Sequence, residues 1–293
     1  MGYQLWTSPQ TGYRRRGTRL PDLSGPLTEH AQISPLVEPL RAAPAGAPST
    51  EIFGLLRDLD FDIAGVREEQ GGPIIGYVRR EELSHGLVKD HLRQCSADLL
   101  IDEEASVRSL LRKLRDTEFV LVKRDGRIEG IATRADLNKP LVRTYFFGLI
   151  SLFEIHLSYW ISRYYPNRSW EGSITVERLE KARVLQAERR EQGQVMELQD
   201  CLYFTDKRNL VSRSEDLRVS LNLGSRKQCN SLLIKVEQLR NTLAHSHYDI
   251  TSGSSWTDLL TLVSRVETAV ELSDELVEQY ARTVDGEVLG RLY

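Results

Sequence analysis

The feature that most constrains the fold of this chain is an internal repeat between about residues 30 and 140. The segment Ile52–Arg57 recurs as Val107–Arg112, and the segment Gly76–Leu83 recurs as Gly130–Leu137. Equivalent residues lie 54 or 55 positions apart. Because each copy of a supersecondary unit has an apolar face to bury, the repeat predicts two similar α/β units that pack together.

Each copy of the repeat predicts a helix, a strand, a turn, a strand and a second helix. In the second copy, Asp125-Gly126 stands between two apolar runs, a pattern typical of a tight β-hairpin. In the first copy the segment 70–73, Gln-Gly-Gly-Pro, takes the same place. The segment 44–49 predicts an irregular loop, with Ser49 or Thr50 as the N-cap of the following helix.

The most specific part of the repeat is the segment 130–136, Gly-Ile-Ala-Thr-Arg-Ala-Asp. There a strand ends, the Thr133 hydroxyl can cap the following helix, and the Asp136 carboxylate lies three residues further on, facing the same cleft. This segment resembles the G-h-x-T-x-x-D signature of cystathionine-β-synthase-type (CBS) domains, regulatory modules that often bind adenosine nucleotides. The resemblance covers roughly residues 30–140 and implies a tandem CBS pair.

The CBS resemblance also implies a set of ligand-binding residues. It assigns Asp136 to the ribose hydroxyls and Thr133 to phosphate or ribose, with Arg134 as a further candidate beside them. The first copy departs from the signature, because Arg79 replaces the Thr and Glu82 replaces the Asp. We therefore expect one competent site, or an altered one in which Arg79 supplies a cation to phosphate. The expected regulatory ligand is AMP, ADP or ATP. The alternative is a purely architectural, dimerising pair in which Thr133 and Asp136 only cap a helix.

After Pro140 the pattern predicts helices alone. The expected helices cover 141–164, 174–191, one or two shorter helices within 196–221, then 226–244 and 257–282. The fold class is therefore α+β, with three parts. They are a flexible N-terminal lead over 1–29 that contains an arginine cluster, a tandem CBS pair (α/β repeat) over 30–139, and an all-α helical domain over 140–293.

The helical half carries Arg240-Asn241, then three residues, then His245, at the end of an amphipathic helix. This resembles the R-N-x-x-x-H motif of HEPN domains, all-helical domains of which many are metal-independent ribonucleases in toxin and antiphage systems. On an ideal helix Arg240 and His245 are about 140° apart around the axis, whereas Asn241 and His245 share one face. A single copy therefore makes a poor pocket, and the resemblance implies a composite site in a homodimer. Either His245 or His247 fits the spacing that the family tolerates.

The residue types suit cleavage of RNA without a metal ion. RNA carries its own nucleophile, the 2′-hydroxyl, so cleavage needs a base, an acid and a cation for the charge on phosphorus. Histidine can serve as base or acid, and Arg240 can hold phosphate oxygens. The expected product end is a 2′,3′-cyclic phosphate. Glu154, an acid in an apolar stretch, is a candidate partner of Arg240, whereas His156 is more often a satisfied core histidine.

The charge balance limits the kinds of partner. Lys and Arg number 39 against 42 Asp and Glu, a net charge of −3, which excludes a general nucleic-acid-coating protein. Residues 207–245, however, hold eight Lys or Arg against three acids. Three scattered cysteines build no disulfide framework or zinc knuckle, no metal site is expected, and the longest apolar run is interrupted by Glu154 and His156. With no apolar signal core at the N-terminus, we expect a cytoplasmic protein that does not enter a membrane.

These patterns lead to one hypothesis and one alternative. The hypothesis is a dimeric HEPN-type endoribonuclease, regulated by an adenosine nucleotide at the CBS pair, in a toxin or antiphage-defence role; its substrate is RNA and catalysis needs no cofactor. The alternative is a non-catalytic module in which the helical domain dimerises and the repeat reports nucleotide levels to a partner protein.

Overall fold

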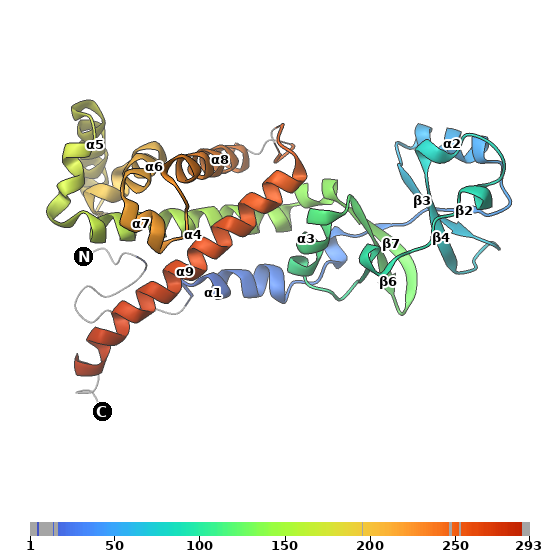
Figure 1. Ribbon diagram of the computed structural model, residues 1–293, viewed down its shortest axis with the longest axis horizontal. Coiled ribbons are helices and arrows are strands. Elements are labelled where there is room, and N and C mark those ends of the chain that lie inside the picture. Colours follow the sequence, from blue (N-terminus) through green and yellow to red (C-terminus); the bar gives the residue numbers. More distant parts are fainter. Residues whose placement is uncertain are drawn as a thin grey trace. The chain divides into compact units, whose positions relative to one another are not determined.

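We analysed a computed structural model of the chain, which describes Leu5, Arg14 and residues 17–194, 196–245, 248–251 and 253–288, with side chains as far as Gln279. The chain divides into two compact units (Figure 1). The repeat unit comprises Leu27–Val142, and the helical unit comprises Met1–Pro26 together with Arg143–Tyr293. The change in pattern predicted near Pro140 falls between Val142 and Arg143.

The two copies of the repeat fold alike. The first consists of β2 (Ala42–Pro44), α2 (Ser49–Asp58), β3 (Ile63–Arg67) and β4 (Ile74–Arg79), and the second of β5 (Leu100–Asp102), α3 (Val107–Asp116), β6 (Phe119–Arg124) and β7 (Arg127–Thr133). In each copy the first strand pairs in parallel with the second, and the second pairs antiparallel with the third. The short strands β2 and β5 were not predicted, since three residues are too few to show an alternating pattern.

The second hairpin turns as the sequence predicts. Asp125 (φ 50°) and Gly126 (φ 77°) both have positive φ, as a two-residue turn that matches the twist of its strands requires. The expected closing helix of each copy, by contrast, is only a short 3-10 helix, Arg80–Glu82 in the first copy and Arg134–Asn138 in the second. Each is too short for the full helix that the sequence analysis expected.

Each copy also pairs with the segment that precedes the other copy, through a two-residue strand in one case and a single bridge in the other. Strand β1 (Glu38–Pro39), before the first copy, pairs with β7 of the second, and Arg93, before the second copy, bridges to Tyr77 in β4 of the first. The equivalent glycines Gly76 and Gly130 permit this close approach. A Cβ atom would lie 2.5 Å from the Arg93 carbonyl oxygen at Gly76, and 2.4 Å from the Val37 side chain at Gly130. The glycines of the repeat are thus required by this exchange of segments.

Apolar side chains hold the two copies together. Leu40 and Tyr77, from the first copy and the strand before it, form a buried cluster with Phe119 and Leu121 from the second. The rings of Tyr77 and Phe119 meet edge to face with centroids 5.4 Å apart. A separate cluster, centred on Val66 and Val78, fills the first copy beneath α2.

The described elements after Pro140 are all helical. They are α4 (Pro140–Tyr164), α5 (Val176–Glu191), α6 (Phe204–Arg213), α7 (Glu215–Ser220), α8 (Arg226–Ala244) and α9 (Trp256–Val288), with short 3-10 segments at Pro166–Ser173 and Leu198–Cys201. The predicted bounds of α8 are confirmed to the residue, because Ser225 caps the helix in a reciprocal pair with Gln228.

Helix α4 is long and apolar enough to cross a membrane by length and composition, and half of its most apolar window is buried within the protein. The sequence analysis counted Glu154 and His156 as interruptions of this run. Both side chains have polar partners inside the helical unit: Glu154 pairs with Lys207, and His156 lies beside Ser273.

The described part of the predicted flexible lead is folded. Helix α1 (Leu20–Ser24) contacts α9, and the Arg14 side chain is buried in an ion pair with Asp274. Asp274 also accepts a hydrogen bond from the Leu20 backbone N–H, 2.9 Å away. The partner of Arg14, Asp274, is 260 residues away in the sequence. The sequence near the arginine cluster therefore gave no sign of this pair, and a solvated tail was the expectation.

Candidate functional site

The first candidate site lies where α4, α6 and α8 meet in the helical unit. The Glu154 carboxylate of α4 accepts a hydrogen bond from Lys207 Nζ of α6 at 3.0 Å, and its other oxygen lies 3.4 Å from Arg240 Nε of α8. The Lys207 side chain is 5% exposed and that of Glu154 20%, whereas Arg240 is 45% exposed. The contact predicted between Glu154 and Arg240 is therefore present, and a buried lysine shares the same carboxylate.

The remaining motif residues lie at the exposed end of α8. Asn241 is exposed in the last turn, and His245 is the exposed C-cap, with its backbone N–H bonded to the Asn241 carbonyl oxygen at 3.0 Å. The helix thus continues through Asn241, which places Asn241 and His245 one turn apart on one face. The alternative histidine, His247, lies outside the described residues.

The arrangement supplies a guanidinium held at one side by a carboxylate, with an amide and an imidazole open to solvent. Arg240 and His245 do not share a face of the helix, since five residues turn the chain by about 140°. One chain therefore presents the cation and the imidazole in different directions. Such a set of groups can act on a single phosphate when a second copy of the chain supplies the other half.

His156 follows two residues after Glu154, on a different face of α4, inside a buried polar cluster. Its Nδ1 lies 2.5 Å from Ser273 Oγ, which also accepts a hydrogen bond from Trp160 Nε1 at 2.6 Å. Burial, together with the nearby Arg14 charge, lowers the pKa of His156 to about 3. The ring is therefore neutral near neutral pH, and the expectation of a satisfied core histidine is confirmed.

Helices α6 and α8 run side by side, with α6 contributing partners that the sequence analysis counted only as charge. Glu237 of α8 accepts a hydrogen bond from Thr205 at 2.6 Å and pairs with Arg208 at 2.7 Å. Lys207 and Arg208 follow one another in α6, yet the first binds Glu154 and the second binds Glu237. Because both pairs join residues at least 29 positions apart, no local pattern in the sequence could have revealed them.

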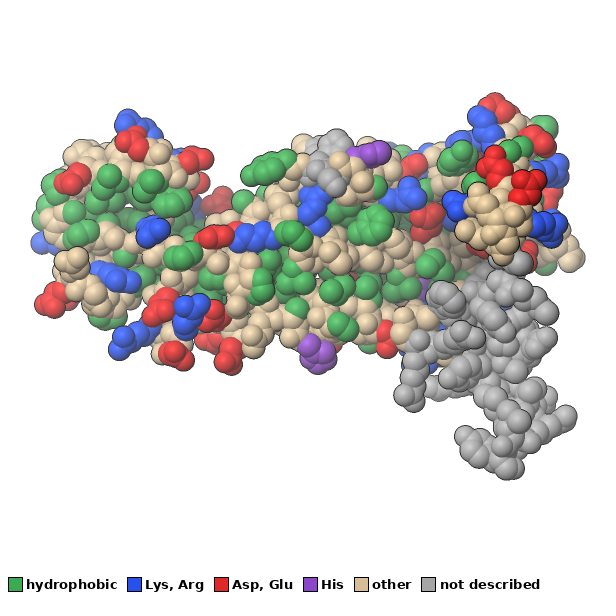
Figure 2. Space-filling model, turned by 180° about the vertical axis from the view of Figure 1, so that it is seen from behind, with side chains coloured by type: hydrophobic (Ala, Val, Ile, Leu, Met, Phe, Trp, Pro, Cys, Tyr) green, Lys and Arg blue, Asp and Glu red, His purple; other side chains and the backbone are tan. Residues whose placement is uncertain are grey.

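The positive stretch 207–245 is thus partly neutralised. Lys207, Arg208 and Arg240 are paired with carboxylates. Basic residues without such a partner among the described residues include Arg226 and Lys227, at the N-terminal end of α8. Figure 2 shows basic and acidic side chains interspersed over the face that it draws, with neither sign covering it. This agrees with the small net charge and restricts any polyanion contact on this face to a local patch.

The second candidate site lies in the repeat unit, around Asp136. Its carboxylate accepts hydrogen bonds from the Thr133 backbone N–H at 2.7 Å and the Thr133 hydroxyl at 2.9 Å, and it pairs with Lys139 at 2.9 Å. Asp136 is buried and Thr133 half-buried. Three of the roughly four acceptor positions of the carboxylate are therefore in use inside the unit. A ribose at Asp136 would have to displace Lys139 or Thr133.

The first-copy residues Arg79 and Glu82 have different partners. Arg79 pairs with Glu118 of the second copy at 3.1 Å, and its guanidinium carbon lies 5.6 Å from the centre of the Phe119 ring. Phe119 is also the strand partner of Thr133, so the structure brings Arg79 and Thr133 to the same residue. Glu82 accepts a hydrogen bond from Arg93 at 2.8 Å, which holds the pKa of its carboxyl below the ordinary value.

Arg134 is placed away from this group of residues by its own contacts. Its guanidinium donates to the carbonyl oxygens of Leu114 at 2.8 Å and Arg115 at 3.0 Å, at the C-terminal end of α3. A cation at that position satisfies carbonyl groups that the helix leaves unpaired. The side chain thus has a structural role in this arrangement, and the predicted ligand contact would require it to leave α3.

Among the residues that the structure describes, no three His, Cys, Asp or Glu side chains are grouped so as to hold a metal ion. Three free cysteines, Cys95, Cys201 and Cys229, lie apart, and burial raises the pKa of the Cys229 thiol to about 11. The groups that the structure places at the two candidate sites are carboxylates, guanidinium and ammonium groups, a hydroxyl, an amide and an imidazole.

No protein-family model matches the chain, and no curated protein matches it significantly. Solved structures that are similar to part of it include CBS-domain proteins. The CBS domain of a bacterial CNNM/CorC family Mg²⁺ transporter in complex with ATP is 17% identical, with a TM-score of 0.33, over 40% of this chain and 88% of that one. The CBS-pair protein CBSX2 of Arabidopsis thaliana is 15% identical, with a TM-score of 0.31, over 36% and 90%. CbpB in complex with c-di-AMP is also 15% identical, with a TM-score of 0.31, over 37% and 83%.

Proposed function

We propose that the helical unit is a metal-independent endoribonuclease of the HEPN type, active as a homodimer in the cytoplasm. The observation that carries this proposal is the contact between Glu154 and Arg240 next to an exposed Asn241 and His245. Glu154 fixes the position of Arg240 while leaving its guanidinium 45% exposed, so the cation stays able to meet an anion from solvent one turn before the exposed imidazole. RNA is the substrate class that such a set can cleave without any added group.

In this proposal each residue has a stated role. His245 takes the proton from the 2′-hydroxyl or gives one to the leaving 5′-oxygen, with the histidine of the second copy acting in the opposite sense. Arg240 stabilises the charge that develops on phosphorus, and Glu154 positions its guanidinium. Asn241 orients the imidazole from the same face of α8. His247 stays the alternative acid or base. The products are a 2′,3′-cyclic phosphate and a 5′-hydroxyl.

The experiment compares RNA cleavage by the wild type, Arg240→Ala, His245→Ala and His247→Ala, in a buffer that contains a metal chelator. We expect cleavage by the wild type and a loss of at least about a hundredfold in Arg240→Ala and in whichever histidine variant removes the acid or base. Full activity in Arg240→Ala, or in both histidine variants, would refute the catalytic roles. A cyclic phosphate is read by mass spectrometry of the fragments.

A second candidate function is nucleotide sensing by the repeat unit, and Arg79 is the residue that favours it. This arginine lies over Phe119, next to Thr133, at the junction of the two copies, where it can offer a cation to phosphate by exchanging its exposed partner Glu118 for the ligand. AMP, ADP or ATP is the proposed ligand. Titration calorimetry with each nucleotide tests it, and we expect binding that Arg79→Ala weakens more than Asp136→Asn, because Asp136 is already engaged by Lys139.

The two functions together describe a ribonuclease gated by nucleotide, in a toxin or antiphage-defence role. The alternative is a non-catalytic dimer that reports nucleotide levels to a partner protein. The two are separated by one comparison: a nucleotide that changes the rate of RNA cleavage supports the gated enzyme, whereas nucleotide binding without any cleavage supports the module.

A further inference from the structure

A cavity between α6 and α8 lies at the end of α8 opposite to the Arg240 motif. Its volume is about 500 Å³, and it is lined by three basic and three neutral polar residues: Asn209, Ser212, Arg213, Arg226, Lys227 and Asn230. Among the described residues, those that line it include no aspartate or glutamate. The lining thus combines positive charge with amide and hydroxyl donors, the set that binds phosphate oxygens.

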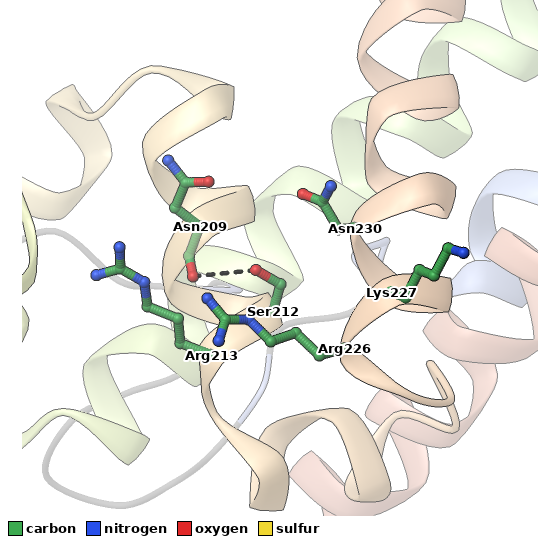
Figure 3. Close-up of a pocket in the computed structure, with 6 residues that line it drawn as sticks. All are labelled: Asn209, Ser212, Arg213, Arg226, Lys227 and Asn230. Atoms are coloured by element: carbon green, nitrogen blue, oxygen red, sulfur yellow. Dashed lines mark hydrogen bonds between the residues drawn. The ribbon is translucent and has the colours of Figure 1, made fainter.

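Among the basic side chains, Arg226 reaches into the space between α6 and α8, whereas Lys227 and Arg213 point away from it on opposite sides (Figure 3). Figure 3 shows the amides of Asn209 and Asn230 facing one another from α6 and α8, with Arg226 reaching toward α6 beside Ser212. Ser212 is buried at the base of the cavity and donates to the Asn209 carbonyl oxygen, 3.2 Å away. Arg213, on the outer side of α6, is held by the Ser173 carbonyl oxygen at 3.1 Å.

The charges here are uncompensated, unlike those at the other end of the helix. Within the described part of the chain, Arg226 and Lys227 form no ion pair with a carboxylate. Both side chains are exposed in the first turn of α8, where the helix dipole adds positive potential to their own charge. Of the basic residues within 207–245 that have no carboxylate partner among the described residues, Arg213, Arg226 and Lys227 line this cavity, whereas Arg218 and Lys235 lie outside it.

The cavity is in line with the proposed active site. Fourteen residues separate Arg226 from Arg240, which places them about 21 Å apart along α8 and within about 40° of one another around its axis. Glu237 lies between Arg226 and Arg240 on α8, and it is paired with Arg208. Its negative charge is therefore compensated and does not repel an anion that lies along α6 and α8. At a rise of 3.4 Å for each nucleotide, about 21 Å corresponds to about six nucleotides of a stacked strand.

We infer that this cavity binds a backbone phosphate of the RNA strand, about six nucleotides from the scissile phosphate at Arg240 and His245. The inference rests on the proposed function for the identity of the strand. The cavity residues contact phosphate and not bases, so they add affinity without sequence preference and set a minimum substrate length. A free phosphate compound has the same chemistry, and the experiment separates the two sources.

The experiment measures RNA binding apart from cleavage. Fluorescence anisotropy follows a labelled single-stranded 14-nucleotide RNA and a trinucleotide on the full chain carrying both His245→Ala and His247→Ala, at 50 to 200 mM KCl. We expect Arg226→Ala/Lys227→Ala to weaken binding of the 14-mer about tenfold at the lowest salt and to reduce the slope of log K against log salt by about 0.7, the value for one phosphate of a single strand. The affinity of the trinucleotide should fall by less than that of the 14-mer, because the trinucleotide cannot span the distance and occupies only one of the two sites at a time.

Matched variants distinguish a binding role from a structural one. Arg190→Ala removes an exposed arginine of α5 outside the cavity and should leave both RNAs unaffected. Arg226→Lys keeps the positive charge at this position, and it should bind the 14-mer with most of the affinity of the chain that retains Arg226 and Lys227. Equal effects of the cavity variant on the 14-mer and the trinucleotide, or none on either, would overturn the inference.

The remaining outcomes separate this inference from the proposed function. If the wild type cleaves no RNA while the 14-mer binds through Arg226 and Lys227, the ribonuclease proposal fails and the phosphate site stands. If the 14-mer does not bind at all, the phosphate site on RNA is refuted. If inorganic pyrophosphate binds in a manner that depends on Arg226 and Lys227 and RNA does not, the site belongs to a free phosphate compound and the strand assignment is wrong.

Discussion

Replacing Glu154 by Gln should destabilise the helical unit because it leaves Lys207 buried with its principal counter-charge removed. The Lys207 ammonium lies 3.0 Å from Glu154 and its side chain is 5% exposed. With an effective dielectric constant of about 20, Coulomb's law gives roughly 5 kcal/mol for unit charges at this distance, and loss of one partner of a buried pair costs about 3 to 5 kcal/mol. Asp200 also interacts electrostatically with Lys207, which favours the lower end, about 3 kcal/mol.

The assay is urea unfolding followed by tryptophan fluorescence. All four tryptophans lie outside residues 27–142, so the signal reports the helical unit and not the repeat unit. The free energy of unfolding extrapolated to zero urea should fall by about 3 kcal/mol, and a thermal scan of the same variant should show a fall of about 6 to 12 °C in the melting temperature. Glu188→Gln, the same change at an exposed position of α5, is the matched control and should alter stability by less than about 0.5 kcal/mol.

A double variant tests whether the uncompensated lysine is the cause. Glu154→Gln/Lys207→Met removes both charges, and neutral groups of similar volume often replace a buried pair at little cost. We expect its stability to recover to within about 1 kcal/mol of the wild type, which is about 2 kcal/mol more stable than Glu154→Gln alone. A Glu154→Gln variant as stable as its control, or a double variant no better than the single one, would show that the pair does not support the unit as reasoned.

Three further predictions follow from the same contacts. Between about pH 6 and pH 4, His156 is neutral in the folded protein and protonated in the unfolded chain, so acid favours the unfolded state. The free energy of unfolding of the wild type should therefore fall by about 1.4 kcal/mol for each unit of pH lost, and His156→Gln should lack this contribution in urea unfolding at successive pH values. Arg134→Met should destabilise the repeat unit by about 1 to 3 kcal/mol, measured by circular dichroism, because its hydrogen bonds to the end of α3 are lost. Unchanged stability together with loss of nucleotide binding would instead show that Arg134 contacts the ligand. Asp136→Ala should cost about 1 to 2 kcal/mol without any nucleotide present, in the same assay, and no loss there would argue against the capping role.

The sequence carried much of the local structure. The repeat predicted two like α/β units, Asp125-Gly126 predicted the hairpin, and the apolar period predicted the helices after Pro140, α8 to the residue. These features depend on residues a few positions apart, where propensity, capping and periodicity act directly. The pairing of Glu154 with Arg240 was also anticipated, because an acid in an apolar helix needs a cation nearby.

The tertiary structure alone decided which polar groups meet over long distances in the chain. It buries Arg14 on Asp274, gives Lys207 to Glu154, uses Arg134 to cap α3, and exchanges a strand between the copies of the repeat. It also gathers Arg213, Arg226 and Lys227 around one cavity, where the sequence showed only a count of charges. The reason is physical: periodicity records which face of an element is buried, but the partner of a charged side chain is set by how the elements pack, and that information is spread over the whole chain.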